Sequence, residues 1–261
     1  MGLLLSHKRK LTVWADMMSV SGIHDSERSG GGKRGDIEIF STGSRYRLFR
    51  LLHQLKFKTV TFITLTYPDL FPTEARVYKA NLKEFHRKFE LAYPGIQAVW
   101  RLEFQSRGAP HFHIMLLDCP FVPISDLLWM WKCTCHTYDM AHELLGVDLK
   151  LITDNGQQKL IATYLAKYIA KVDERKVKDA KQKCGRWWGK WNVIDPTPME
   201  FEISDREAER IVTFLLDARV GGQDWQPLDA TLCTVFGSSM GGGSFGEFIC
   251  RYKDIIGGSS G

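Results

Sequence analysis

The sequence of 261 residues contains little cysteine, no long hydrophobic run and no phosphate-binding loop. Its six cysteines are too few and too scattered for a disulfide scaffold, so we expect free thiols in a reducing cytoplasm. No apolar segment approaches the roughly 20 residues that a membrane-spanning helix needs, and the N-terminus shows no secretory pattern. The consensus G-x-x-x-x-G-K-[ST] is missing, since Arg34 follows Lys33, and we therefore expect no ATPase motor.

Positive charge is concentrated in two parts of an otherwise ordinary composition. Hydrophobic residues make up 44% of the chain and charged residues 25%, which is typical of a globular protein. The formal net charge is +5, yet residues 159–191 carry +7, from ten Lys or Arg and three acids, and residues 1–60 carry +6. Two basic blocks indicate a polyanionic partner such as nucleic acid, and the alternative is a solvated charged surface.

The composition divides the chain into three parts. Residues 1–44 are predicted to form a partly flexible N-terminal extension, because Ser29–Gly35 (S-G-G-G-K-R-G) is typical of a linker. Residues 45–220 carry regular hydrophobic patterns and are predicted to form the globular domain. Residues 221–261 are rich in Gly and Ser and are predicted to be a poorly ordered tail.

Hydrophobic periodicity and turn residues predict both helices and strands in the globular part. The predicted helices cover residues 44–55, 73–93, 125–138, 157–171 and 204–218, and the predicted strands cover residues 59–66, 96–104, 111–117, 147–152 and 199–203. The short turn between residues 104 and 111 predicts an antiparallel hairpin. We therefore expect an α+β fold, in which helices flank a central antiparallel sheet.

The helix predicted over residues 73–93 has an apolar and a basic face. Four apolar residues at helical spacing are predicted to point inward: Val77, Leu82, Phe85 and Phe89. Four basic residues are predicted to point outward: Lys79, Lys83, Arg87 and Lys88.

The predicted hairpin carries a candidate metal site. Residues i and i+2 of a strand share a face, so His111 and His113 should project together while Phe112 enters the core. Glu103 lies on the partner strand, where it can reach a shared ion. Two histidines and one carboxylate leave open coordination positions, which suits a catalytic Mn²⁺ or Mg²⁺. The alternatives are two ordinary strand histidines and a surface carboxylate paired with an arginine.

A tandem Tyr-x-x-Lys pattern occupies the predicted helix at residues 157–171. Tyr164 and Tyr168 lie one turn apart on a helix and therefore share a face. A tyrosine can attack a phosphodiester and form a covalent link, while Lys167 or Lys171 holds phosphates or stabilises developing charge. The alternative is a core-facing stripe at helical spacing.

Two further clusters allow more than one interpretation. Cys133, Cys135 and His136 resemble metal ligands in type, but their spacing fits no standard zinc site. Trp187, with Trp188 and Trp191, lies among Arg186 and Lys190. Aromatic and basic residues in this mixture can bind single-stranded bases, or the tryptophans can pack a loop against the core.

These motifs, in this order, resemble the rolling-circle replication initiators, members of the HUH endonuclease superfamily. The resemblance covers about residues 55–195. It rests on Phe62–Pro68, on Gly108–His113 and on the tyrosines at 164–171, whose tandem arrangement is similar to initiators of small single-stranded DNA phages and plasmids. Gly185–Gly189 (G-R-W-W-G) is similar to a segment that follows the tyrosine motif in such proteins.

The resemblance implies a fold, an activity and roles for residues. The fold would be the ferredoxin-like or RRM-like sandwich of HUH endonucleases. His111, His113 and Glu103 would hold one divalent metal, Tyr164 would be the first nucleophile, Tyr168 the second, and Lys167 would position the phosphate. The protein would nick and rejoin single-stranded DNA at an origin through a 5′-phosphotyrosine, in a bacterial host cytoplasm with host helicase and polymerase. We expect DNA contacts from Arg107, Lys171, Arg186, Trp187 and Lys190.

Three other functions fit parts of the same pattern. A single-tyrosine HUH transposase would need only one of the two tyrosines. A non-catalytic module would bind single strands through its sheet without cleaving them. A metal-dependent hydrolase would cleave without either tyrosine.

Overall fold

The computed structural model describes residues 9–13, 17–22, 40–55, 57–136, 146–153, 184–217 and 231–236. The chain forms two compact units. One contains residues 33–48 and 57–194, and the other contains residues 1–32, 49–56 and 195–261. None of the described helices is long and apolar enough to cross a membrane.

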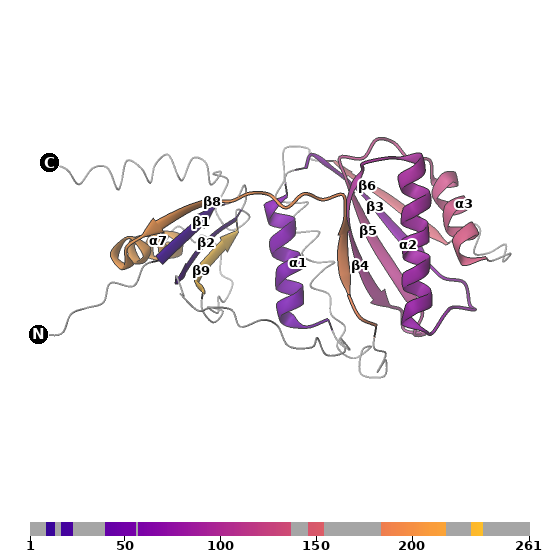
Figure 1. The fold of residues 1–261 in the computed structure, drawn as a ribbon, viewed down its shortest axis with the longest axis horizontal. Coiled ribbons are helices and arrows are strands. Elements are labelled where there is room, and N and C mark those ends of the chain that lie inside the picture. The colour runs from indigo at the N-terminus through magenta and orange to yellow at the C-terminus, as the bar shows by residue number, and fades with distance from the viewer. Residues whose placement is uncertain are drawn as a thin grey trace, which may run out of the picture. The chain divides into compact units, whose positions relative to one another are not determined.

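A five-stranded antiparallel sheet forms the larger unit (Figure 1). Its order is β6 (Val147–Thr153), β3 (Thr59–Thr66), β5 (Pro110–Leu117), β4 (Gln97–Phe104) and β7 (Trp188–Trp191). Every neighbouring pair is antiparallel. The structure confirms the predicted α+β fold, and β3 has the bounds that its run of β-branched residues predicted.

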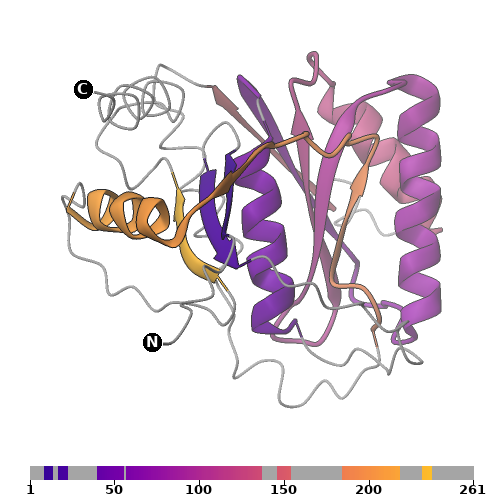
Figure 2. The same ribbon diagram turned by 60° about the vertical axis from the view of Figure 1, so that its left-hand side comes forward.

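Two helices cover one face of this sheet, α2 (Ala75–Ala92) and α3 (Ile124–Cys135) (Figures 1 and 2). Phe112 of β5 is fully buried on that face, with its ring centroid 6.3 Å from that of Tyr78 on α2. Trp131 of α3 is also fully buried and donates from Nε1 to the carbonyl of Thr66, at 2.7 Å. The helices therefore fix the end of β3 as well as filling the core.

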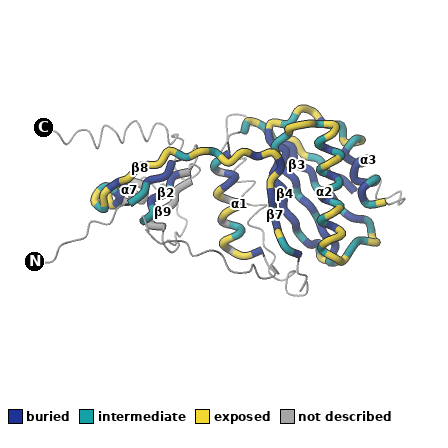
Figure 3. Tube along the Cα trace, viewed as in Figure 1, coloured by how far each residue is buried: buried dark blue, intermediate teal, exposed yellow. Residues whose placement is uncertain are grey.

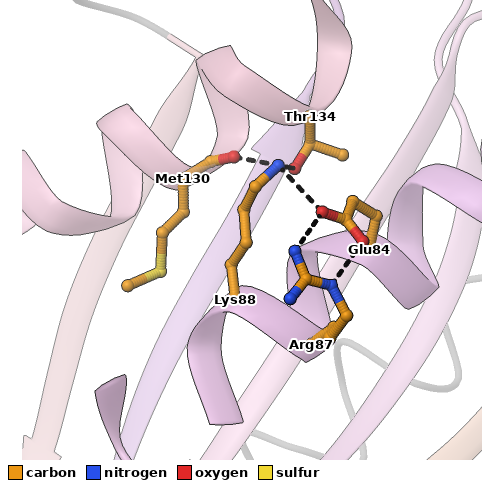
Figure 4. A network of polar contacts seen from close by, with 5 residues as sticks. All are labelled: Glu84, Arg87, Lys88, Met130 and Thr134. Atoms are coloured by element: carbon orange, nitrogen blue, oxygen red, sulfur yellow. Dashed lines mark hydrogen bonds and ion pairs between the residues drawn. The ribbon is translucent and has the colours of Figure 1, made fainter. Parts of the chain in front are cut away.

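The α2–α3 contact includes a polar network that explains the position of Lys88 (Figure 4). Lys88 Nζ donates to Thr134 Oγ1 at 3.1 Å and lies 3.2 Å from a Glu84 carboxylate oxygen. Thr134 Oγ1 in turn donates to the carbonyl of Met130 at 2.7 Å. Glu84 also accepts two hydrogen bonds from Arg87, each 2.8 Å long. Lys88 was predicted to point outward but lies between the two helices, where its ammonium is satisfied.

The apolar stripe of α2 differs from the predicted one at its start. Tyr78, Leu82, Phe85 and Phe89 are buried, whereas Val77 is 39% exposed. Figure 3 shows buried and exposed positions alternating along α2. The prediction for Val77 was wrong because the adjacent Tyr78 takes the inward position. Lys79 was also predicted to point outward, but its ammonium lies 4.6 Å from the centroid of the Trp100 ring.

The other described helix of this part of the chain is α1 (Thr42–Gln54). Within the larger unit, Ser44 accepts a 3.1 Å hydrogen bond from Trp188 Nε1, and Leu48 lies beside Phe62, Met115 and His113. These three residues belong to the sheet face opposite the one covered by α2 and α3, because their strand positions alternate with those of Phe112 and its neighbours.

The smaller unit contains a four-stranded antiparallel sheet, in the order β8 (Met199–Ile203), β1 (Arg9–Val13), β2 (Met17–Gly22) and β9 (Thr231–Phe236). The helix α7 (Asp205–Asp217) follows β8, and Ser204 and Glu207 exchange the hydrogen bonds of a capping box. β1 and β2 lie in the predicted N-terminal extension, and β9 lies in the predicted tail. β1 and β2 are short and pair with each other, but the other partner of each, β8 or β9, comes from the far end of the chain, so no local pattern marked this sheet.

Candidate functional site

Glu103, His111 and His113 meet on the sheet face that α2 and α3 leave uncovered. The β4–β5 register places Glu103 opposite His111 and Arg101 opposite His113. The turn between the strands closes through Gly108, which has a φ of 82° and donates to the carbonyl of Gln105 at 2.8 Å. The predicted hairpin and the shared face of the two histidines are thus confirmed.

The imidazoles and the carboxylate converge closely. His113 Nε2 lies 3.0 Å from Glu103 Oε2, and the centroids of the two imidazole rings are 4.6 Å apart. The side chains of His113 and Glu103 are 15% and 33% exposed. The group is therefore largely desolvated but still reachable from solvent, so a ligand can approach it.

Two threonines of β3 orient the histidines from the other side. Thr66 Oγ1 lies 3.2 Å from His111 Nδ1, and Thr64 Oγ1 lies 3.4 Å from His113 Nδ1. A hydroxyl can donate to Nδ1 or accept from it, so both imidazole tautomers are accommodated. Because Nδ1 of each ring is engaged by a threonine, a ligand would bind through Nε2, which in His113 already contacts Glu103. Sequence reasoning missed this role, although the Thr64-x-Thr66 spacing matches that of His111-x-His113.

Burial and charge set the protonation of the site. Burial, together with the neighbouring His113, lowers the pKa of His111 to about 4. Burial acts to raise the pKa of Glu103, but the hydrogen bond with His113 and the charge of Arg101 hold that pKa below its ordinary value. At neutral pH, His111 is therefore neutral and Glu103 is ionised, the states in which both bind metal.

The donor set suits a divalent cation, although the ligands are not already arranged around one. Imidazole nitrogen and carboxylate oxygen are ligands for Mn²⁺, and the Thr–His hydrogen bonds correspond to the outer-shell contacts of metal-bound histidines. Within the described ranges, no group of three His, Cys, Asp or Glu side chains has the arrangement of a formed metal centre. In the structure, the Glu103 carboxylate instead hydrogen-bonds directly to His113.

Arg107, predicted to contact DNA, braces the end of β3. Its guanidinium donates to the carbonyl oxygens of Tyr67 and Pro68, at 2.5 and 2.8 Å, and its Nη1 lies 3.3 Å from Asp69 Oδ1. The guanidinium also lies 5.2 Å from the centroid of the Phe71 ring. These contacts hold the segment after Thr66 against the β4–β5 turn, so Arg107 acts in positioning the site.

Of the DNA contacts predicted in and beside the G-R-W-W-G segment, one is buried and two are exposed. Trp187 was expected to stack on bases, but its ring is only 5% exposed and packs against Phe40 and Phe104. The structure therefore gives Trp187 a core role. Arg186 and Lys190 are both exposed.

The predicted tyrosine motif falls outside the described residues: Tyr164, Lys167, Tyr168 and Lys171.

Cys133 and Cys135 lie on α3 as free thiols, and His136 ends that helix with a φ of 51°.

Comparison with known proteins identifies the class of this region. Residues 60–173 match the family model described as Replication-associated protein ORF2/G2P. That range contains nearly all of β3, the histidine hairpin and the predicted tyrosine motif, and the match confirms the predicted resemblance of this part of the chain to replication-associated proteins. Searches of curated proteins and of solved structures found no match.

Proposed function

We propose that this protein is an HUH endonuclease that nicks and rejoins single-stranded DNA at a replication origin through a covalent tyrosine intermediate. The observation that carries the proposal is the convergence of Glu103, His111 and His113 on one sheet face, with Thr64 and Thr66 at the two Nδ1 atoms. The match of residues 60–173 to a replication-associated family supports the same reading.

Mn²⁺ or Mg²⁺ bound by these three residues would polarise the scissile phosphate and stabilise charge on its oxygens. His111 contributes a neutral imidazole, because burial and His113 keep its pKa low. Glu103 contributes the negative charge, and the charge of Arg101, two residues away on the same strand, helps to keep the Glu103 pKa low. The threonines orient both rings through Nδ1, and Nε2 of each would bind the metal.

The covalent step is assigned to Tyr164. Its phenolate oxygen forms a bond to phosphorus, the P–O3′ bond breaks, and the 3′ oxygen leaves as a hydroxyl after taking up a proton. The products are a 5′-phosphotyrosine and a free 3′ end, which a polymerase can extend. A phenol with a pKa of about 10 is a moderate leaving group, so attack by a 3′-OH can reverse the step without ATP. Tyr168 would repeat the reaction to release the product, and Lys167 would hold the phosphate.

The test is an incubation with labelled single-stranded DNA of its replicon and Mn²⁺, followed by a denaturing gel. We expect a DNA–protein adduct that Tyr164→Phe, His111→Ala and His113→Ala each abolish. An adduct that vanishes only in Tyr168→Phe would reverse the two tyrosine roles. If Tyr168→Phe does not change adduct formation, the result supports a single-tyrosine transposase.

Two outcomes would overturn the proposal. Cleavage without an adduct that survives loss of both tyrosines would indicate a metal-dependent hydrolase. Binding of origin DNA without cleavage, unchanged in His111→Ala, would indicate a non-catalytic binding module. The proposed setting is a bacterial host cytoplasm, where a host helicase and polymerase would unwind and extend the nicked strand.

A further inference from the structure

A second, basic pocket lies on the sheet face that carries α2, away from the histidines. Its volume is about 440 Å³, within the range of sites for small ligands. Basic side chains from α2 and from the segment before β7 line it, with tryptophans of β4 and β7: Arg76, Lys79, Lys83, Arg186, Trp100 and Trp191. The position opposes the histidine site because Trp100 and Trp191 alternate with Arg101 and Lys190 on their strands.

Positive charge in this pocket has little compensation from carboxylates. Among the described residues that line the pocket there is no Asp or Glu. Arg76, at the exposed end, pairs with Glu74 at 2.7 Å. Lys79 lies deeper, where its ammonium donates to the carbonyl oxygen of Arg186 and sits over the Trp100 ring. No carboxylate in the described part of the chain forms an ion pair with Lys79.

The electrostatic consequence is visible at Lys79. Burial, with a further contribution from the charge of Arg186, lowers the pKa of Lys79 to about 8, although the Cys184 thiol acts in the opposite direction. A desolvated cation beside a second cation costs free energy until an anion joins it. A phosphate group between Lys79 and Arg186 would supply that anion.

Two glycines of the G-R-W-W-G segment shape the pocket. Gly185 has a φ of 68°, a conformation that side chains disfavour, and it turns the chain so that Arg186 follows at the pocket. At Gly189, a Cβ atom would lie 2.7 Å from the Trp100 ring. The absence of a side chain there lets β7 pack against Trp100, which lines the pocket.

We infer that this pocket binds one nucleotide of the single-stranded DNA substrate, with its phosphate between Lys79 and Arg186. The inference rests on the proposed function, because it assigns a second contact of the same substrate. β7 is the edge strand of the sheet, so a single strand can pass around it from the histidine face to this pocket. Lys190, exposed on the histidine face of β7, lies on that path.

The test measures binding of the full chain to a fluorescein-labelled oligothymidylate by anisotropy over a range of salt concentrations. Each phosphate contact with a single strand contributes about 0.7 to the slope of log K against log salt. Arg186→Gln should lower the slope, and Arg186→Gln with Lys79→Met should remove the whole contribution of this one phosphate, about 0.7. Arg186 is exposed, so its variant tests the proposal even if Lys79→Met fails to fold.

Two controls separate this contact from general charge loss. Lys58→Met removes an exposed cation that does not line the pocket. The salt slope of this variant should stay close to that of the parent. Lys79→Arg retains the charge and should retain most of the slope. Slopes of the Arg186 and Lys79 variants equal to that of Lys58→Met would overturn the inference.

The source of the phosphate is tested by competition. Free thymidine monophosphate should not displace the oligonucleotide at equal nucleotide concentration. If the variants instead lose binding of the free nucleotide and keep the oligonucleotide slope, the pocket serves a free nucleotide and the inference is overturned. Adduct formation reports separately on the proposed function. If the parent forms an adduct but the variants keep the parent's salt slope, only the second contact is refuted. If the variants lower the salt slope but the parent forms no adduct, only the cleavage chemistry is refuted.

Discussion

Acidification is expected to destabilise the protein through His111. Burial and the neighbouring His113 hold the pKa of this imidazole at about 4, below its ordinary value of 6.5. Between these values, the unfolded chain binds a proton that the folded protein does not bind, so the free energy of unfolding falls as the pH decreases through this window. Linkage gives a loss of about 2 kcal/mol between about pH 7.5 and 5 from this residue alone. The contribution of His111 to the free energy of unfolding is fully present above the pKa that its imidazole has in the unfolded chain.

The measurement is urea unfolding at a series of pH values, with a chelator present so that metal does not contribute. His111→Gln has no titrating group, and its free energy of unfolding should change by about 2 kcal/mol less than that of the parent over the same range. His136→Gln, at the exposed end of α3, is the matched control and should behave as the parent. Equal pH dependence of the parent and His111→Gln would refute the argument that burial keeps this imidazole neutral.

Three further predictions follow from the packing and the hydrogen bonds. Thr66→Val should weaken Mn²⁺ binding about 10- to 100-fold by calorimetry, because outer-shell partners of ligating histidines contribute that much, and unchanged affinity would argue against metal at His111. Gly189→Ala should lower the free energy of unfolding by about 1–3 kcal/mol, since its Cβ would overlap Trp100, and a neutral change would show that the ring can move away. Phe112→Ala should cost about 3–5 kcal/mol because Phe112 is fully buried, whereas Val77→Ala, at an exposed position, should cost far less.

The histidine hairpin could be predicted because its geometry is local. Alternation along one strand places His111 and His113 on one face and Phe112 on the other, whatever the rest of the chain does. A short turn then fixes the register, which brings Glu103 opposite His111. The same local periodicity predicted β3 and most of α2, and it was wrong at Val77, where the spacing allowed either of two adjacent residues to point inward.

The partners of these residues could not be predicted, since they come from distant segments. Thr66 meets His111 across 45 positions of sequence, and Trp188 of β7 reaches Ser44 across 144. Trp187 has the composition of a base-stacking residue, but its burial depends on Phe40 and Phe104 closing around it. Lys79 is spaced like a solvated surface lysine, and only the approach of β7 to Trp100 places it beside Arg186.

The sequence by itself determined the shared face of the histidine pair and four strands of the larger sheet, β3, β4, β5 and β6, because each depends on backbone sterics and hydrogen bonding among near neighbours. Its motifs also carried the likeness to replication initiators. It did not predict β7, whose residues had been expected to bind bases or to pack a loop. Tertiary structure alone decided the threonine contacts of the imidazoles, the neutral state of His111, the basic pocket and the pairing of β1, β2 and β9 with β8 in one sheet. Those features arise where segments far apart in sequence exclude water from one another, and no local pattern carries that information.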